Sequence, residues 1–217
     1  MRAQDLTETA RLAADLPWRA PGLRPRRDAV ALYRAGWLDL ATRSHPLQPY
    51  AVALPLAGWA VSRASSLGAA AVVGWGALGV VAWSLAEYAI HRFLFHAEVR
   101  TAQGRILTFL AHGHHHVWPR DPRRLAATPI QLGSTVLFFV GLSKALPHPE
   151  ARHAFVAGAL VGYAAYEAVH WMAHHGRPTH RWLKALQDHH LKHHHLAPTS
   201  RWGIGTPLWD RAFRTLR

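Results

Sequence analysis

The stretch LGAAAVVGWGALGVVAWSLAEYAIHRFLFH, residues 67–96, decides the fold of this chain. Its apolar part, residues 67–90, is long enough to cross a membrane, which takes roughly 17 to 25 residues of α-helix. The stretch ends with two histidines, His91 and His96. A membrane span that leads into metal-binding side chains predicts a metal site against a lipid bilayer, and such a site suggests redox chemistry on lipid.

Three further apolar runs are present, at residues 47–63, 128–146 and 154–173. The run 47–63 is short and contains Pro55, so it is the weakest of the four as a span. A tight turn at Ser65 to Gly68 joins it to the quoted stretch, and a polar turn joins the other two runs. The pattern predicts an all-α integral membrane protein with about four transmembrane helices in two hairpins.

Residues 1–46 differ from the rest because they are polar and rich in Arg and Pro. We expect this N-terminal segment to be cytosolic or interfacial, and no cleavable signal peptide is visible in it. Asp28 to Thr42 is predicted to form a helix whose apolar face lies in the membrane interface or packs on the rest of the protein. The apolar face would consist of Val30, Leu32, Tyr33, Trp37, Leu38 and Leu40.

The basic residues are distributed unevenly over this topology. The turns 63–67 and 144–153 carry Arg63, Lys144 and Arg152, whereas the opposite side carries the other 22 of the 25 lysines and arginines. By the positive-inside rule the basic side is cytoplasmic, which places both termini and the clustered histidines there. Because the positive charge flanks spans, we expect it to meet anionic lipid head groups and not a nucleic acid.

Imidazole is the expected metal-binding group, because the chain has no cysteine for a thiolate site or a disulfide. Ten of the eighteen histidines lie in four short clusters, enough to hold two metal ions. The clusters are His91 and His96; His112, His115 and His116; His170 and His174; and His190, His193 and His194.

The spacing within the clusters is typical of helices. His170 and His174 are four residues apart and therefore share a helix face. The second cluster has the offsets 0, 3 and 4, which also give one face, and the fourth cluster repeats these offsets. His91 and His96 are five residues apart and do not share a face of an α-helix, so we expect them to reach two different metals or to straddle a helix end.

From the residues alone, shifts of the assignment by one position stay open. Each of four further histidines adjoins a predicted ligand and could take its place: His114, His175, His189 and His195. The alternative for the clusters as a whole is a histidine-rich loop that only buffers metal. Such a loop needs neither the repeated spacing nor the anchoring at span ends.

Carboxylates near the clusters are candidates for orienting the imidazoles by accepting their second N–H. We predict this role for Glu87, Glu167 and Asp188, with a salt bridge to an arginine as the alternative for Glu167. Neutral imidazole binds iron, zinc, copper or nickel, so the ligand type does not identify the metal.

With these motifs the chain resembles the fatty acid hydroxylase branch of the sterol desaturase and fatty acid hydroxylase superfamily, and within it the fatty acid 2-hydroxylases. The matching stretches are EYAIHRFLFH at 87–96, HGHHHVWPRDPRRL at 112–125, YAAYEAVHWMAHH at 163–175, HHLKHHH at 189–195 and WGIGTPLWD at 202–210. The histidine motifs run in the family's order, HxxxxH, HxxHH, HxxxH and HxxHH. The position of Trp202 and Gly203 favours the frame that starts at His190 over one that starts at His189.

The resemblance implies a hydroxylase membrane domain at residues 47–217 with about four transmembrane helices and a cytosolic helical cap. The ten clustered histidines would hold a dimetal centre that activates dioxygen. The implied reaction inserts one oxygen atom into a C–H bond of the acyl chain of a fatty acid or sphingolipid, at the carbon next to the carboxyl. Iron is the expected working metal and zinc a form found on isolation, because zinc does not change its oxidation state.

The resemblance also implies an external source of electrons. Family members with a fused b-type cytochrome domain carry their own donor, whereas this chain has 46 residues before its first predicted span. We therefore expect a separate electron-donor protein, for which the basic face is a docking surface.

Two other functions stay open: a hydroxylase or desaturase of another lipid, such as a sterol or carotenoid, and a non-catalytic membrane metal store or transporter. Arg120, Arg123 and Arg124 are candidates for contacting the anionic part of a lipid, with a membrane-surface anchor as the alternative. The preferred chain length and the choice between a free and an esterified acyl group depend on the shape of the cavity.

Overall fold

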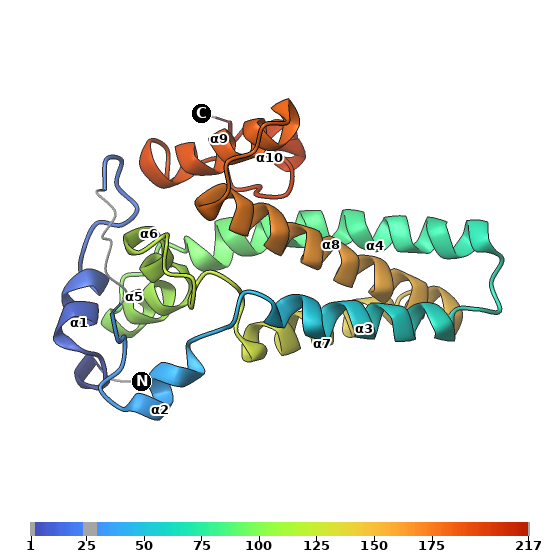
Figure 1. Cartoon of the computed structure of the whole chain (residues 1–217), viewed down its shortest axis with the longest axis horizontal. Coiled ribbons are helices and arrows are strands. Elements are labelled where there is room, and N and C mark those ends of the chain that lie inside the picture. Colours follow the sequence, from blue (N-terminus) through green and yellow to red (C-terminus); the bar gives the residue numbers. More distant parts are fainter. Residues whose placement is uncertain (1–2, 24–29, 217) are drawn as a thin grey trace.

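A bundle of four long helices forms one part of the molecule, and a cap of shorter helices covers one end of it (Figure 1). The computed structural model describes residues 3–23 and 30–216. The long helices are α3 (Gln48–Arg63), α4 (Ala69–Ala89), α7 (Pro129–Ser143) and α8 (Pro149–His175). Each corresponds to one of the four predicted apolar runs, and α8 packs against the other three.

Helix α8 begins five residues before the predicted apolar run. The His148 side chain accepts a hydrogen bond from the backbone N–H of Ala151, and Pro149 occupies the first turn. Both features are favourable at a helix start, where backbone N–H groups have no partner within the helix. Part of the predicted polar turn is therefore helical.

Helices α4 and α8 approach each other backbone to backbone. A Cβ atom on Gly79 would overlap the carbonyl oxygen of Phe155, and one on Gly158 would overlap the backbone of Gly76. Small residues at such contacts are typical of helix pairs in membranes. Trp83 fills the space beside this contact, 5.1 Å from the ring of Tyr163.

The outer surface of the bundle is apolar. Large exposed side chains on it include Trp59, Val73, Val81, Leu137 and Phe138. An apolar surface of this kind marks a membrane or partner contact. Among the described residues one helical stretch, Ala69–Phe95, is long and apolar enough to cross a membrane, and Pro129–Ser143 is a shorter apolar helix.

The cap is built from three parts of the chain. After α4 come η2 (Ile90–Phe95), α5 (Ala102–Thr108), η3 (Phe109–Gly113) and α6 (His114–Val117). After α8 come α9 (Arg181–His195) and α10 (Leu208–Ala212). The N-terminal segment contributes η1 (Ala3–Asp5), α1 (Glu8–Ala14) and α2 (Gly36–Ala41).

The predicted helix from Asp28 to Thr42 is wrong over residues 30–35; residues 28 and 29 lie outside the described residues. Leu32 and Tyr33 are buried in a non-helical segment, and Tyr33 forms an isolated bridge with Leu6. The Asp39 carboxylate accepts a hydrogen bond from the N–H of Leu32 at 2.6 Å. This contact turns the chain before α2, so the six apolar residues do not form one face, and Trp37 is 73% exposed.

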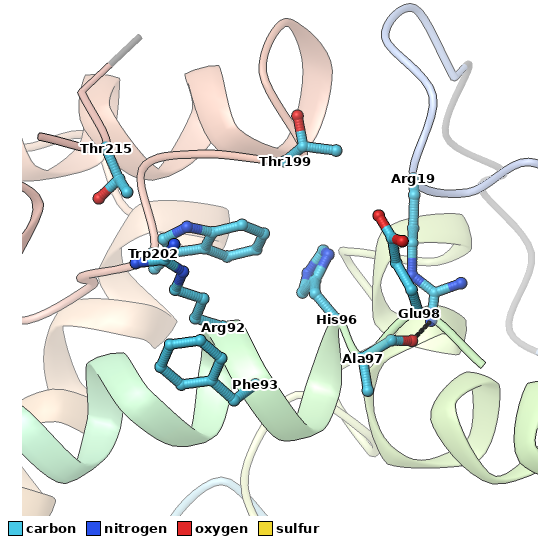
Figure 2. Close-up of a pocket in the computed structure, with 9 residues that line it drawn as sticks. All are labelled: Arg19, Arg92, Phe93, His96, Ala97, Glu98, Thr199, Trp202 and Thr215. Atoms are coloured by element: carbon cyan, nitrogen blue, oxygen red, sulfur yellow. Dashed lines mark hydrogen bonds between the residues drawn. The ribbon is translucent and has the colours of Figure 1, made fainter. Parts of the chain in front are cut away.

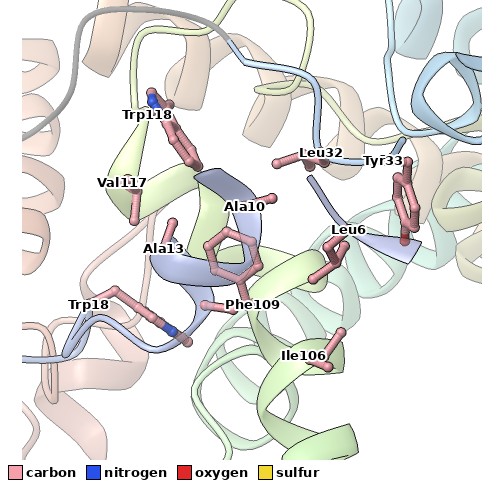
Figure 3. Packing of buried hydrophobic residues seen from close by; sticks show 11 residues of the cluster. Leu6, Ala10, Ala13, Trp18, Leu32, Tyr33, Ile106, Phe109, Val117 and Trp118 are labelled. Atoms are coloured by element: carbon pink, nitrogen blue, oxygen red, sulfur yellow. The ribbon is translucent and has the colours of Figure 1, made fainter. Parts of the chain in front are cut away.

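The N-terminal segment is an integral part of the cap (Figure 3). Leu6, Ala10 and Trp18 are buried against Phe109 and Trp118 from the α5–α6 region. A hydrophobic cluster that the segment shares with the α5–α6 region therefore holds it in the cap.

A buried ion-pair network ties the same parts together. The Arg124 guanidinium contacts Asp39 at 2.7 Å and Asp121 at 3.1 Å. Arg124, a candidate for lipid contact from the sequence, is thus committed to the interior of the cap. Arg120 and Arg123 are exposed.

Candidate metal centre

The ten clustered histidines come together as two groups of five at the junction of bundle and cap. All ten are buried, and within each group the candidate ligand atoms lie within 4.8 Å of one another. Centre 1 consists of His91, His96, His112, His116 and His193. Centre 2 consists of His115, His170, His174, His190 and His194.

His91 and His96 belong to the same centre, so the expectation of two different metals is wrong. The alternative expectation, that they straddle a helix end, agrees with the structure, because His91 lies in η2 and His96 directly follows its last residue. The helix widens to a π-helix over Ile90–Phe95, and the N–H of His96 donates to the carbonyl oxygen of His91 at 3.1 Å. A π-turn closes a hydrogen bond between residues five apart. It therefore brings both histidines round to one face.

The two triads are each divided between the centres. His112 and His116 belong to centre 1, whereas His115 faces centre 2. In the last triad His190 and His194 belong to centre 2 and His193 to centre 1. In the α-helix α9, His190 and His194 are four residues apart and differ in direction by about 40°, whereas His193 points about 100° away from His194. The other triad is divided in the same way, with His112 in η3 and with His115 and His116 in α6. Each triad thus supplies a pair to one centre and a single ligand to the other.

The Nε2 atoms of the rings face one another. His91 and His112 approach at 3.0 Å in centre 1, and His174 and His190 at 2.8 Å in centre 2. The backbone determines which nitrogen of His91 is protonated, because its Nδ1–H donates to the carbonyl oxygen of Trp202 at 2.6 Å. His193 donates in the same way to the carbonyl oxygen of Ser200, at 2.7 Å. Their Nε2 lone pairs are therefore free for a cation.

This arrangement fits metal ions. Neutral imidazole carries one N–H and one lone pair, so several inward-facing Nε2 atoms cannot all satisfy one another. His194 is the clearest case, because neither of its buried ring nitrogens has a hydrogen-bond partner among the described residues. An all-imidazole set suits divalent iron, zinc, copper or nickel.

The protein environment keeps the cap histidines neutral. Burial, and next the neighbouring imidazoles, lower the pKa well below 6.5 for His112, His115, His116, His190 and His194. For His193 burial and His91 act in the same direction. Neutral imidazole is the form that binds metal.

The four neighbouring histidines lie outside both centres. His114 faces the carbonyl oxygens of Phe109 and Arg124, at 3.2 and 3.4 Å. His175 is exposed. His189 faces the Asp210 carboxylate at 3.2 Å, and His195 accepts a backbone hydrogen bond from Gly22. The geometry therefore favours the frame His190, His193 and His194.

The three carboxylates predicted to orient imidazoles have other partners. Glu87 accepts hydrogen bonds from the backbone N–H groups of Ile204 and Gly205, and Glu167 accepts one from Ala127. Asp188 is half-exposed and pairs with Lys184. Glu87 and Glu167 thus hold loops against the bundle, while backbone carbonyls orient His91 and His193.

Asp210 holds the loop that orients His91. Its carboxylate accepts hydrogen bonds from the N–H groups of Trp202 and Gly203, at 2.9 and 2.8 Å. Trp202 itself packs edge-on against His96, with ring centroids 4.8 Å apart. The sequence motif WGIGTPLWD pointed to this loop only through the family resemblance. The contact of the Trp202 carbonyl oxygen with His91 could not be predicted from side-chain spacing, because every residue has a backbone carbonyl.

A cavity of about 400 Å³ adjoins centre 1 (Figure 2). His96 and Trp202 lie on its wall, together with Arg19 and Arg92. Arg19 comes from the N-terminal segment, and its Nη2 donates to the carbonyl oxygen of Ala97 at 2.9 Å. No motif in the sequence had pointed to the N-terminal segment as a neighbour of the histidines.

Known proteins resemble this chain over most of its length. Dihydroceramide fatty acyl 2-hydroxylase FAH1 of Arabidopsis thaliana is 34% identical over 165 residues, 75% of this chain and 70% of that protein. Fatty acid 2-hydroxylase of Rattus norvegicus is 42% identical over 144 residues, 64% of this chain but 38% of that protein. The solved structure of full-length scs7p, with only the hydroxylase domain visible, matches with a TM-score of 0.82 and 25% identity, covering 98% of this chain and 90% of that chain.

The family assignment rests on the same residues as the metal centre. The sequence model described as fatty acid hydroxylase matches residues 76–215, a range that contains all ten histidines of the two centres. That range is more than half of the chain. The predicted family is confirmed, and the chain belongs to the fatty acid hydroxylase family.

Proposed function

We propose that this protein is a membrane-bound dimetal oxygenase that hydroxylates the acyl chain of a fatty acid or sphingolipid at the carbon next to the carboxyl. The observation that carries the proposal is the pair of adjoining centres, each with five buried imidazoles, in a member of this family. The relatives named dihydroceramide fatty acyl 2-hydroxylase and fatty acid 2-hydroxylase support the position of the reaction.

The five histidines of each centre would hold one metal ion, with iron as the working metal. A bound redox-active pair would supply the reduction of dioxygen by two external electrons, so that one oxygen atom enters the C–H bond and the other leaves as water with two protons taken from solution. Zinc supports the same ligation without this redox chemistry. A zinc-filled protein is therefore expected to be inactive.

The side chains around the centres orient the ligands and exclude water. In centre 1, Phe95 stacks on His112 with ring centroids 5.1 Å apart, and Trp202 covers His96. In centre 2, Tyr166 stacks on His170 at 5.7 Å. Aromatic walls of this kind hold imidazoles in one orientation and keep bulk water from the reacting C–H bond.

The four long helices would cross the membrane with the cap on the cytoplasmic side. At about 1.5 Å per residue, the 16 residues of α3 extend about 24 Å. The hydrocarbon core is about 30 Å thick, so α3 and α7 would need local thinning of the bilayer. The distribution of basic residues in the sequence supports the cytoplasmic orientation, because 22 of the 25 lysines and arginines lie outside the turns 63–67 and 144–153.

Electrons would come from a separate donor protein. The net charge of +13 gives the cytoplasmic face a sign that attracts an acidic partner. Anionic lipid head groups would occupy the part of that face next to the membrane.

Mass spectrometry of lipids tests the function. Cells expressing the protein, supplied with iron, a competent electron donor, fatty acids and dihydroceramide, are expected to contain acyl chains with one added oxygen next to the carboxyl. His170→Ala and His174→Ala should abolish the product, because each removes a ligand of centre 2. His175→Ala is the matched control and should retain it, because that side chain is exposed and lies outside both centres.

Other outcomes of this experiment would favour one of the two alternative functions. An oxygenated sterol or carotenoid in place of the hydroxyacyl product would transfer the activity to another lipid. Two bound metal ions together with an unchanged lipid profile would indicate a metal store or transporter.

A further inference from the structure

The N-terminal segment reaches the metal ligands through a tryptophan. The Trp18 ring lies edge-on to His96, with centroids 5.1 Å apart, and is tilted against His116 at 5.4 Å. Both histidines belong to centre 1. Trp18 is 2% exposed, so its contact with the two ligand rings is shielded from solvent.

Residues 18–22, which we call the strap, are fastened on both sides of centre 1. The Arg19 guanidinium lies over the Trp18 ring at 4.0 Å and donates to the carbonyl oxygen of Ala97, next to His96. At the other end of the strap, the N–H of Gly22 donates to the carbonyl oxygen of His195 at 2.9 Å. The strap thus connects the end of η2 with the end of α9.

A glycine in the second histidine motif makes room for the tryptophan. A Cβ atom on Gly113 would lie 2.6 Å from Cε2 of Trp18, closer than atoms can approach. Trp18 therefore fits against the segment that carries His112 and His116 only because residue 113 has no side chain. All three segments that supply ligands to centre 1 meet the strap.

The strap also borders the cavity beside centre 1. Arg19 and His96 both line it, and Figure 2 shows the Arg19 guanidinium beside the backbone of Ala97. His96 is 6% exposed despite the neighbouring cavity. Contacts with the rings of both Trp18 and Trp202 explain this low exposure.

We propose that Trp18 is a positioning residue of centre 1: its ring holds His96 and His116 in the orientation that binds the ion and closes that side of the centre to water. The role rests on the proposed two-metal centre but not on the lipid chemistry. Among the described residues, no ring contact joins Trp18 to a histidine of centre 2, so the effect is confined to one of the two ions.

Zinc release tests this role without reference to activity. The protein, purified in detergent and loaded with zinc, is mixed with a chromophoric chelator, and both equivalents are followed in time. In Trp18→Ala, one equivalent is expected to leave about 10- to 100-fold faster than in the wild type, the usual loss when a residue supporting a ligand is removed. The other equivalent should leave at the wild-type rate, and Trp18→Phe should restore most of the retention.

Trp118→Ala is the matched control. Trp118 is 5% exposed and belongs to the same hydrophobic cluster, but among the described residues its ring contact is with Phe109 and with no histidine of either centre. Removing it creates a similar cavity, so the melting temperature should fall in both variants, while zinc release should change only in Trp18→Ala. In Gly113→Ala the added Cβ would overlap the Trp18 ring and displace it, so this variant should also accelerate the release of one equivalent.

Equal zinc release from Trp18→Ala and Trp118→Ala, or equal acceleration of both equivalents in Trp18→Ala, would overturn the proposal. If Trp18→Ala does not fold, Gly113→Ala decides, and wild-type zinc release from Gly113→Ala overturns the role. A wild-type protein that binds fewer than two ions would instead overturn the proposed metal centre, on which the role of Trp18 depends. Selective zinc release in a protein without hydroxylase activity would support Trp18 and reject only the lipid chemistry.

Discussion

Asp210 links the C-terminal loop to the candidate metal ligands. Its carboxylate is fully buried and accepts hydrogen bonds from the N–H groups of Trp202 and Gly203. The carbonyl oxygen of Trp202 in turn orients His91. A change at Asp210 is therefore expected to affect His91, a candidate ligand with which Asp210 itself makes no hydrogen bond in the described structure.

Asp210→Asn should destabilise the protein and loosen centre 1. One carboxylate oxygen becomes an NH₂ group that cannot accept, so a buried donor loses its partner at a cost of about 1–3 kcal/mol. Denaturant unfolding measures the stability, and metal analysis measures the occupancy. Asp188→Asn is the control, because Asp188 is 50% exposed and its pair with Lys184 should contribute under about 1 kcal/mol. Equal effects in the two variants would contradict the role of Asp210.

The same residue predicts a pH dependence in acid. Burial raises the pKa of Asp210, but the hydrogen bonds from His189, Thr215, Gly203 and Trp202 outweigh it and lower the pKa below 3.8. The unfolded chain therefore takes up the proton first as the pH falls. The stabilisation by Asp210 is complete above its unfolded pKa and is lost on acidification below about pH 4. The free energy of unfolding of the wild type should fall more steeply in this window than that of Asp210→Asn. If both proteins lose stability equally between neutral pH and acid, Asp210 is not the group responsible.

At the scale of elements, two short π-helices position the first two histidine motifs. η2 ends directly before His96, and η3 contains His112 and precedes the helical turn with His115 and His116. Each wide turn changes the direction of the side chains that follow. Such segments are frequent at functional sites because they direct ligands where an α-helix would not.

The contact between α4 and α8 predicts a difference between two glycines of α4. Gly79→Ala should lower the stability by about 1–3 kcal/mol, because its Cβ would overlap the carbonyl oxygen of Phe155. Gly74→Ala is the matched control: nothing lies within 4 Å of a Cβ there, and alanine favours the helix. Thermal unfolding in detergent compares them. Similar melting temperatures would show that α4 and α8 are not in backbone contact.

For the whole molecule, the cap and the far turns lie at opposite ends of the bundle (Figure 1). Because the chain has no cysteine, single cysteines report the topology without background. Ser66→Cys lies in the turn after α3, and Ala185→Cys lies on the exposed surface of α9. A membrane-impermeant maleimide should label Ser66→Cys in intact cells, and Ala185→Cys only after permeabilisation. Labelling of both from the same side would contradict the proposed orientation.

Metal removal should affect the stability of the whole fold. The candidate ligands of centre 2 come from α8 of the bundle and from the cap, and two of those of centre 1 lie in or directly after η2, which continues α4. An ion present at about 100 times its dissociation constant contributes about 2.7 kcal/mol per site. For a chain of this size that corresponds to about 5–10 °C in melting temperature. A chelator that removes one ion should lower the melting temperature by this amount and one that removes both by about twice as much, and added zinc should restore it. A melting temperature that does not respond to a demonstrated loss of metal would indicate that the ions do not join the two parts.

The sequence by itself determined the features that depend on neighbouring residues. Hydrophobic runs of sufficient length specified the four long helices to within a few residues, because each run must bury or expose its side chains as one element. Histidines at offsets of three and four specified the ten imidazoles that gather in the two centres. The order of these motifs also identified the family.

Only the tertiary structure decided which histidine faces which centre and what surrounds it. The π-helix at His91 alters the phase of the chain in a way that the spacing HxxxxH alone does not reveal. Asp39 turns residues 30–35 out of a helix through a hydrogen bond, and Trp18 reaches His96 across a gap of 78 positions in the chain. These contacts join residues distant in sequence, so they arise from packing and not from local periodicity.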